Sequence, residues 1–483
     1  MNKKELIIFV IFTFFVGFLG AFVGLKVMEP KLVTNENIKA PAASENSNVE
    51  NENMQLIQEA YELIEGNYVE DVEDGQLLEG AIQGMIDTLD DPYSSYMNVE
   101  DIKEFNEQIE SSFQGIGAEV SLVDGIVTIV SPIKNSPAEK AGLRPNDQIL
   151  KVDDESLEGL DLNEAVAKIR GEKGTEVVIL VQRKGVSKPK EYTLIRDDIP
   201  IETVYNEIKE VDGKKTGIIE ITSFSETTAK EFEEALTKLE DKGMEGLVID
   251  VRGNPGGLLD SIEDILHHFV PSDVPYLQIE DGNGEVDKFY TKLDEKKSYP
   301  INVIVDEGSA SASEILAVAM KEIGYDIVGE NTFGKGTVQQ AVPIGKDKDQ
   351  NTVKLTFYKW LSPEGNWIHE KGVKPTVEQK QPAYFYTSPI QVEKTFVLDQ
   401  NDEEIAHAQT MLKGLGYDSK RDDGYFDETT KQAVQSFQKD HDLKVTGEID
   451  EKTAGKIESE ILDIIRSGKE DLQLEKALDV LYK

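Results

Sequence analysis

The sequence predicts a multidomain protein of the α+β class. Apolar residues recur at helical spacing over 54–105, whereas alternating apolar residues at 126–130 are typical of a strand. Residues 246–259, GLVIDVRGNPGGLL, indicate a buried strand, a glycine-rich turn and an apolar helix. With 483 residues the chain is long enough for about two to four domains.

The charge balance is strongly acidic. The chain has 51 basic and 93 acidic side chains, which gives a formal net charge of -42. Because such a surface repels polyanions, nucleic acid is excluded as a partner. Cysteine is absent and the five histidines are scattered, so we expect no disulfide framework, no metal site and no cofactor.

The N-terminal part begins with an apolar segment. Residues 6–25 are almost purely apolar, and about 20 helical residues span a hydrocarbon core of roughly 30 Å. We expect residues 1–28 to be a signal anchor, with a cleaved signal peptide as the alternative. Residues 29–53 are rich in Asn, Glu, Ser and Ala, which predicts a flexible linker before a helical region at 54–102.

A candidate nucleophile lies in DEGSASASEI at 306–315. Small residues continue to Ser313 and apolar residues then follow at helical spacing, so Ser311 lies where a helix begins. Unpaired N–H groups and the helix dipole can stabilise negative charge on a substrate carbonyl there. The structural alternative is a capping box, because Ser311 and Glu314 have its spacing.

A candidate base lies in TFGKGTVQQ, which begins at Thr332. Lys335 stands between two glycines, and an extended chain would place Lys335 and Gln339 on one face, where the amide could hold the amine. An amine acts as a base near neutral pH only if burial lowers its pKa from about 10.4 to roughly 7 or 8. We expect the apolar wall that this requires from Phe333, Val338 and Ile327.

A nucleotide-binding P-loop is the rival interpretation of the same lysine. Residues 329–335, GENTFGK, match its first seven positions. The next position must offer a hydroxyl to magnesium and open a helix, whereas Gly336 leads into the strand-like TVQQAVP. The sequence therefore disfavours nucleotide binding.

The glycine-rich turn in residues 246–259 exposes backbone N–H groups. By itself the turn is typical of an ordinary connection between a strand and a helix. Beside a serine nucleophile, the N–H of Gly257 becomes a candidate oxyanion donor together with that of Ala312.

These three segments resemble those of the C-terminal processing peptidases, also called tail-specific proteases. The resemblance implies an α/β, crotonase-like protease core, expected over 196–381. It also implies that Ser311 attacks, that Lys335 is the base with Gln339 as its partner, and that Gly257 occupies the oxyanion position. The motif LDDPYSSY, eight residues that close the N-terminal helical region, is similar to the same family and is expected to serve packing and subunit contact.

Residues 103–195 contain a second group of motifs, FQGIGAEV and SPAEKAGLRPNDQIL, and resemble a PDZ domain. The turn formed by Gly115, Ile116, Gly117 and Ala118 would present N–H groups to the terminal carboxylate of a peptide. The strand after the turn would pair with the peptide, and a helix over 162–169 would line the groove. Arg170 at the end of this helix is either a contact to the ligand or the protease, or a helix C-terminal charge.

The C-terminal part contains EIAHAQTMLKGLGY, DGYF and LKVTGEID, and it resembles a small helical peptidoglycan-binding module. We expect this module over 401–458, after a linker at 382–400, either to bind cell wall or to act as a spacer. Apolar residues recur at helical spacing within 459–483, so these terminal helices are expected to dock on a surface or to join the subunits of a homodimer.

The motifs together predict a bacterial serine endopeptidase, anchored in the plasma membrane by a single span, with its catalytic part outside the cytoplasm. Its expected substrates are proteins or peptides with free C-termini, and peptidoglycan is a further expected partner. The alternative is a catalytically silent scaffold that joins a PDZ domain to a wall-binding module.

Overall fold

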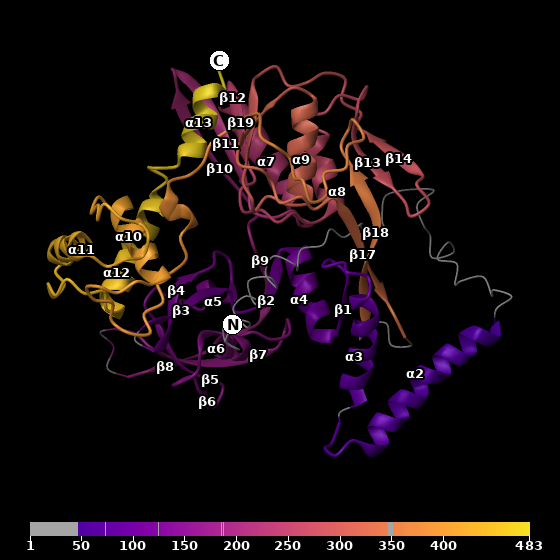
Figure 1. The fold of residues 1–483 in the computed structure, drawn as a ribbon, viewed down its shortest axis with the longest axis horizontal. Helices are drawn as coiled ribbons and strands as arrows, with labels where there is room; N and C mark the ends of the chain where they lie inside the picture. The colour runs from indigo at the N-terminus through magenta and orange to yellow at the C-terminus, as the bar shows by residue number, and fades with distance from the viewer. Residues whose placement is uncertain (1–46, 73, 124, 185, 187, 346–350) are drawn as a thin grey trace.

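The computed structural model describes residues 47–483 except 73, 124, 185, 187 and 346–350 (Figure 1). The expected signal anchor lies outside the described residues. Among the residues that are described, no helix has both the length and the apolarity to cross a membrane. The first helix among the described residues, α2 (Ser47–Asn67), begins inside the segment predicted as a linker, and α3 (Asp74–Asp87) and α4 (Val99–Glu110) follow it.

A six-stranded sheet forms the centre of the largest domain. In spatial order its strands are β10 (Val204–Val211), β11 (Lys214–Ile221), β12 (Gly246–Asp250), β15 (Ile301–Val305), β16 (Asp326–Gly329) and β19 (Val377–Glu378). β10 runs antiparallel to β11, and the other neighbours are parallel. Parallel strands are joined through helices, which explains the strand, turn and helix order of the sequence.

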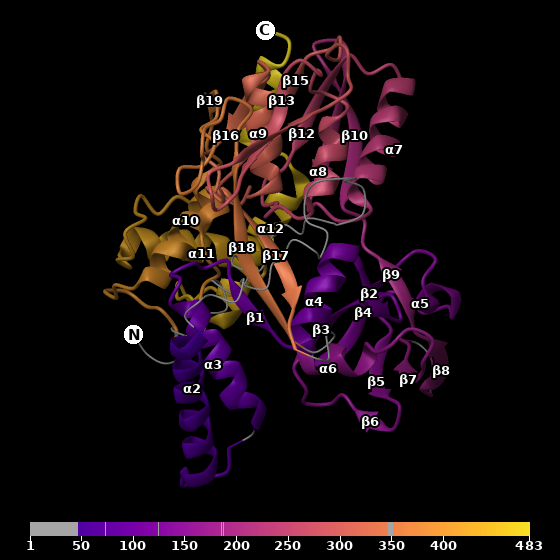
Figure 2. The same ribbon diagram turned by 90° about the vertical axis from the view of Figure 1, so that its right-hand side faces the viewer.

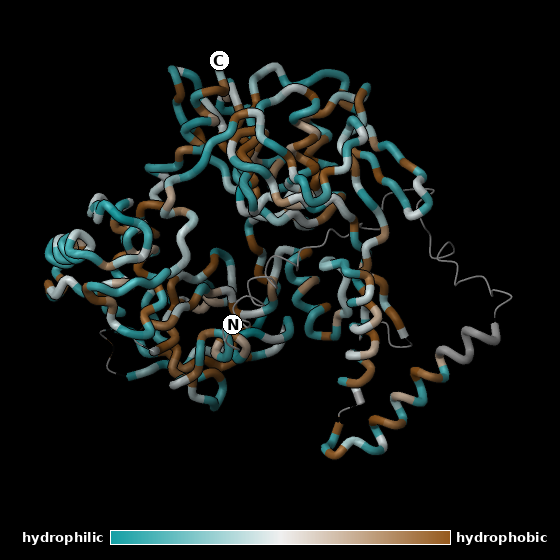
Figure 3. The backbone as a smooth tube through the Cα atoms, viewed as in Figure 1, coloured by the Kyte–Doolittle hydropathy of each residue, from teal (hydrophilic) through white to brown (hydrophobic). Residues whose placement is uncertain are grey.

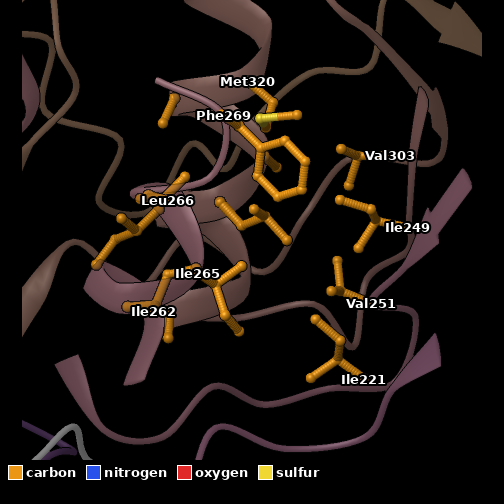
Figure 4. Close-up of a cluster of buried hydrophobic side chains, with 14 of the residues drawn as sticks. Ile221, Ile249, Val251, Ile262, Ile265, Leu266, Phe269, Val303 and Met320 are labelled. Atoms are coloured by element: carbon orange, nitrogen blue, oxygen red, sulfur yellow. The ribbon is translucent and has the colours of Figure 1, made fainter. Parts of the chain in front are cut away.

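Three helices cover one face of this sheet: α7 (Thr228–Asp241), α8 (Leu259–Leu266) and α9 (Ala312–Glu322). Figure 4 shows strand residues such as Ile249 and Val303 facing Ile265, Phe269 and Met320, and all five are fully buried. β12 and β15 are apolar at nearly every position because both of their faces are covered, as is usual for parallel strands.

The opposite face of the sheet is covered by the C-terminus of the chain. In α13 (Leu472–Val480), Ala477 packs with Leu481, just after the helix, against apolar residues of four strands. The Arg252 guanidinium, which follows β12, donates to both carboxylate oxygens of Asp471 at 2.7 Å. The prediction that a terminal helix docks on a surface is therefore confirmed, and that surface belongs to the same chain.

A second sheet lies beside the first, with the order β1, β18, β13, β14 and with β17 also paired to β18. Its strands are β1 (Ser95–Met97), β13 (Pro275–Glu280), β14 (Val286–Tyr290), β17 (Thr337–Pro343) and β18 (Thr352–Leu361). β17 and β18 extend from the central domain toward α3 and α4 (Figure 2). β1, from the N-terminal part, pairs with the far end of β18.

The PDZ-like domain contains the antiparallel path β3 (Ala118–Val123), β4 (Ile126–Pro132), β5 (Gln148–Val152), β7 (Glu176–Gln182) and β8 (Lys190–Ile195). The remaining elements are β6 (Glu155–Ser156), α5 (Pro137–Lys140) and α6 (Leu162–Ile169). A separate pair, β2 (Ser112–Gly115) and β9 (Asp197–Pro200), leads into and out of the domain. The predicted strand at 126–130 and the predicted helix at 162–169 are both present.

The C-terminal domain consists of α10 (Glu403–Gly414), α11 (Glu428–Asp440) and α12 (Glu451–Ser467) around one apolar core. A short helix, η1 (Ala383–Tyr386), lies in the segment predicted as a linker. Its Tyr384, together with Ile390 and Phe396, is buried in the same core. The ordered domain therefore begins well before residue 401.

Because α13 packs on the central sheet, we predict that Leu481→Ala destabilises the protein by about 2–5 kcal/mol through the cavity that it leaves. Leu472→Ala is the matched control: its side chain is 38% exposed, so it should cost less than about 1 kcal/mol. Urea unfolding of both variants measures the two free energies. Equal stability of the two variants would contradict the docking of α13.

Candidate active site

Ser311 lies immediately before α9 in a strained backbone conformation. Its φ is 53° and its ψ is -112°, a combination that a residue with a side chain rarely adopts. Gly256 of the glycine-rich turn lies opposite, and a Cβ atom there would be 2.8 Å from the Cβ of Ser311 and 2.8 Å from the carbonyl oxygen of Ala310. The close approach of the two turns therefore requires glycine at position 256.

Glu314 joins the serine loop to the lysine loop. Its buried carboxylate accepts hydrogen bonds from the N–H of Ser311 at 2.9 Å and from the N–H of Lys335 at 2.7 Å. The other carboxylate oxygen accepts from the Gly334 N–H at 2.7 Å and from the Thr332 hydroxyl at 2.6 Å. Burial raises the pKa of Glu314, and these four donors oppose that rise by stabilising its charge.

The capping-box interpretation of Ser311 holds only in part. Glu314 accepts from the Ser311 N–H, as the pattern predicts. The N–H of Glu314, however, donates to the backbone carbonyl of Ser311 and not to its side chain. The Ser311 hydroxyl is therefore not used as a helix cap in the described structure.

Two backbone N–H groups beside Ser311 are available to a substrate oxygen. Neither the N–H of Gly257 nor that of Ala312 donates a hydrogen bond to any described residue. Gly257 has a φ of 145°, and a Cβ there would lie 2.0 Å from the carbonyl oxygen of Phe224. Position 257 therefore accepts only glycine, and the two N–H groups can serve as an oxyanion hole.

Lys335 is buried beside the serine loop. Burial, followed by the positive charge of Lys354, lowers the pKa of the Lys335 amine to about 7. Of the three apolar residues that were expected to surround the amine, Val338 and Ile327 are buried, but Phe333 is 40% exposed. The ring of Tyr93 instead lies over the amine, with 4.9 Å between Nζ and the ring centroid.

Gln339 is buried on β17, next to a bulge between Val338 and Gln339. Its amide nitrogen donates to the hydroxyls of Thr337 at 2.9 Å and Thr356 at 3.0 Å. Its Oε1 is buried and has no hydrogen-bond partner among the described residues. The amide oxygen is therefore an unused acceptor at the site.

Two contributors were missed by the sequence reasoning. Glu314 was considered only as a helix cap, because its partners 334 and 335 are distant in sequence. LDDPYSSY was expected to serve packing and subunit contact, yet Asp91 accepts a hydrogen bond from Thr356 at 2.6 Å and Tyr93 covers Lys335. Only the similarity of this motif to the same peptidase family could have indicated its importance.

The lysine turn does not resemble a phosphate-binding loop. Gly336 is followed directly by strand β17, where a P-loop would open a helix. Among the described residues, no cluster of three or more His, Asp or Glu side chains could hold a metal ion.

The predicted carboxylate-binding turn of the PDZ-like domain lies between β2 and β3. The N–H groups of Ile116 and Gly117 donate to no described residue, whereas their carbonyls accept from Ala138 and Ile133. Gly117 has a φ of 73°, and a Cβ there would lie 2.3 Å from the Cβ of Ser136. Close packing therefore fixes the turn, and the N–H groups of Ile116 and Gly117 can donate to a ligand.

Arg170, at the end of α6, contacts the N-terminal helical region. Its guanidinium pairs with Glu107 of α4 at 3.0 Å and lies 5.0 Å from the ring centroid of Phe113. The side chain therefore bridges the PDZ-like domain and α4. Both expected roles of Arg170, a contact to the ligand or the protease and a helix C-terminal charge, therefore stay predictions.

Family models match four parts of the chain. The model of Peptidase family S41 matches residues 215–379, and that of the Activating protease CtpB N-terminal domain matches residues 14–101. A PDZ domain model matches residues 128–183, and a peptidoglycan binding domain model matches residues 401–457.

Similar proteins are found over the full length. The Carboxy-terminal processing protease CtpB of Bacillus subtilis (strain 168) is 49% identical over 483 residues and is covered fully, as is this chain. CtpA of the same organism is 44% identical over 88% of this chain and 90% of its own length. Among solved structures, the photosystem II D1 C-terminal processing protease matches 68% of this chain and 92% of its own, with 26% identity and a TM-score of 0.41.

Because Glu314 fixes both loops, we predict that Glu314→Gln slows cleavage of an unfolded protein by at least about 100-fold. The amide keeps only one acceptor oxygen, so its NH2 group faces N–H donors of the site, which should also cost about 1–3 kcal/mol of stability. Glu307→Gln, in the exposed part of the same loop, is the control and should match the wild type. A wild-type rate for Glu314→Gln would contradict this role.

Proposed function

The chain belongs to the carboxy-terminal processing proteases of peptidase family S41, and we propose that it cleaves proteins with a Ser311, Lys335 and Gln339 mechanism. It is a serine-type protease with a PDZ domain and a peptidoglycan-binding domain. The observation that carries the mechanism is the buried amine of Lys335, whose loop is held by the same carboxylate as the loop of Ser311.

In the proposed reaction, the neutral amine of Lys335 takes the proton of the Ser311 hydroxyl while Oγ attacks the substrate carbonyl. The N–H groups of Gly257 and Ala312 stabilise the resulting oxyanion. The lysine ammonium then gives its proton to the leaving amine, and the acyl group stays on Ser311. The amine then takes a proton from water while the water oxygen attacks the acyl carbon, and the ammonium returns this proton to Ser311 Oγ as the acyl group leaves.

Gln339 has the role of an acceptor for Lys335 in this mechanism. When Lys335 gains a proton, the ammonium needs acceptors, because a buried charge is costly unless it is hydrogen-bonded. The unused Oε1 of Gln339 supports this role. Gln339 thereby stabilises the charged form that exists only after proton transfer.

In the proposed function, the PDZ domain, the N-terminal segment and the C-terminal domain bind the substrate, the membrane and the cell wall. The turn at Ile116 and Gly117 captures the free C-terminus of a substrate, and Arg170 couples the PDZ domain to α4. The segment at 6–25 anchors the protein in the bacterial plasma membrane, with the catalytic part outside the cytoplasm. The C-terminal domain binds peptidoglycan beside that membrane.

A homodimer is also part of the proposal. α2 projects from the rest of the molecule, and apolar residues recur along it (Figures 1 and 3). Leu56, Ile57, Leu63 and Ile64 on this helix are 44–64% exposed. Because apolar area on one projecting helix is buried most simply by a second copy, α2 supports a symmetric contact between subunits.

We predict that the cleavage rate rises with pH through an apparent pKa of about 7, because Lys335 must lose its proton to act as the base. Lys335→Arg should be inactive, since a guanidinium stays protonated, and Ser311→Ala should be inactive at every pH. Cleavage of reduced and carboxymethylated lysozyme measures the rates. A flat profile from about pH 6 to about pH 9, or an active Ser311→Ala, would refute the mechanism.

We predict that peptides ending in Ala, Val or Leu bind the Ser311→Ala protein, and that their C-terminal amides bind about ten- to a hundredfold more weakly. Amidation removes the anionic acceptor for the N–H groups of Ile116 and Gly117. Fluorescence anisotropy of labelled peptides gives both dissociation constants. Equal affinity of acid and amide would rule out capture of the carboxylate.

A further inference from the structure

The segment between α3 and β1 reaches into the protease domain. β1 pairs with β18 so that Ser95 lies opposite Lys354 and Met97 lies opposite Thr352. Ser94 and Met97 are buried there. Residues 91–97 are therefore an edge of the domain that carries the catalytic serine and not only a connection between helices.

Asp91 and Thr356 form the centre of a hydrogen-bonded relay in this edge. The hydroxyl of Thr356 donates to Asp91 Oδ2 at 2.6 Å, and the hydroxyl of Ser94 donates to the same oxygen at 2.6 Å. The N–H of Thr356 in turn donates to the Ser94 hydroxyl at 3.1 Å. The Asp91 carboxylate thus accepts from the hydroxyls of Thr356 and Ser94, and the Ser94 hydroxyl accepts from the Thr356 N–H.

The relay decides how the Gln339 amide is oriented. A hydroxyl has one proton, and Thr356 gives it to the Asp91 carboxylate, which can only accept. The Thr356 oxygen can then act only as an acceptor, so it must face the NH2 group of Gln339, which lies 3.0 Å away. The amide oxygen is turned to the other side.

The consequence is the unused acceptor at Oε1 of Gln339. A buried carbonyl oxygen without a hydrogen bond is rare in folded proteins, and such groups are often kept for function. If the amide flipped, its oxygen would face the oxygen of Thr356, which has already given up its proton. The relay therefore prevents the flip.

We propose that Asp91 is a positioning residue of the protease, which acts through Thr356 to hold Gln339 with its amide oxygen free for the protonated catalytic lysine. This role rests on the proposed Ser311, Lys335 and Gln339 mechanism. It makes the N-terminal region a part of the catalytic site, since removal of the segment before β1 removes the first member of the relay.

The same segment also faces the lysine directly. Tyr93 places its ring over the Lys335 amine, and an aromatic face favours the ammonium form that arises after proton transfer. Burial, with the charges of Glu314 and Asp91, raises the pKa of Tyr93 to about 12, so the phenol stays neutral. Among the described residues, the charged or titratable groups that face Lys335 include Glu314 of α9, Lys354 of β18, Tyr93 and Asp91.

The test uses the full chain and compares Thr356→Val with Thr356→Ser. Valine keeps the shape but ends the relay, so kcat for reduced and carboxymethylated lysozyme should fall by about 10- to 100-fold with little change in KM. The Thr356→Ser variant keeps the hydroxyl, so its kcat should lie within about threefold of the wild-type value. Equal kcat values for the two variants would overturn the proposal, because a packing effect does not distinguish them in this way.

Asp91→Asn adds a readout that a purely structural role would not change. The Asp91 charge favours the ammonium form of Lys335, so its removal should move the rising limb of the pH profile to lower pH, whereas Thr356→Val should leave the limb in place. The control is Asp90→Asn, whose exposed side chain precedes the relay and which should behave as the wild type.

Failure of the positioning role of Asp91 can be distinguished from failure of the proposed protease function. If Thr356→Val and Asp91→Asn have wild-type kcat while Ser311→Ala is inactive, the relay has no positioning role and the proposed function stands. If the wild type is as inactive as Ser311→Ala, the proposed function fails and the positioning role fails with it.

Discussion

The buried carboxylate of Glu314 is the constraint on which the rest of the proposed catalytic site depends. It accepts four hydrogen bonds, two from the turn that carries Lys335, one from Thr332 and one from the N–H of Ser311. Because a carboxylate can only accept, every donor around it has one permitted orientation. The strained backbone of Ser311 persists because this network and the close contact with Gly256 hold it from both sides.

Two segments from opposite sides of the central domain in the sequence, β1 and α13, pack onto that domain. At the N-terminal side, β1 extends the sheet of β18 and brings Asp91 and Tyr93 to Gln339 and Lys335. At the C-terminal side, α13 covers the second face of the central sheet, fixed by the pair of Arg252 and Asp471. The candidate site therefore depends on contacts with segments that are far from it in sequence.

Local patterns in the sequence were sufficient to predict several helices, strands and turns of this structure. The helix after Ser311, the strand after Gly336 and the turn at Gly257 all follow from short motifs, since propensity and periodicity are local properties. The contacts of Asp91 with Thr356 and of Glu314 with Lys335 could not be predicted in this way. They join residues that are distant in the chain, and a solvated loop has the same residue types as a buried relay. The ordered segment at 383–396 was predicted as a linker for the same reason, because its aromatic residues are buried only by the helices that follow.

The central claim is that burial keeps Lys335 neutral near physiological pH within a site built around Glu314. It is tested most directly by an NMR titration of the protein labelled with carbon-13 at the lysine side chains, with the Lys335 signal assigned from its loss in Lys335→Arg. The account predicts that this amine titrates at about 7, far below the usual lysine value of about 10.4. A Lys335 midpoint close to that usual value would contradict the account.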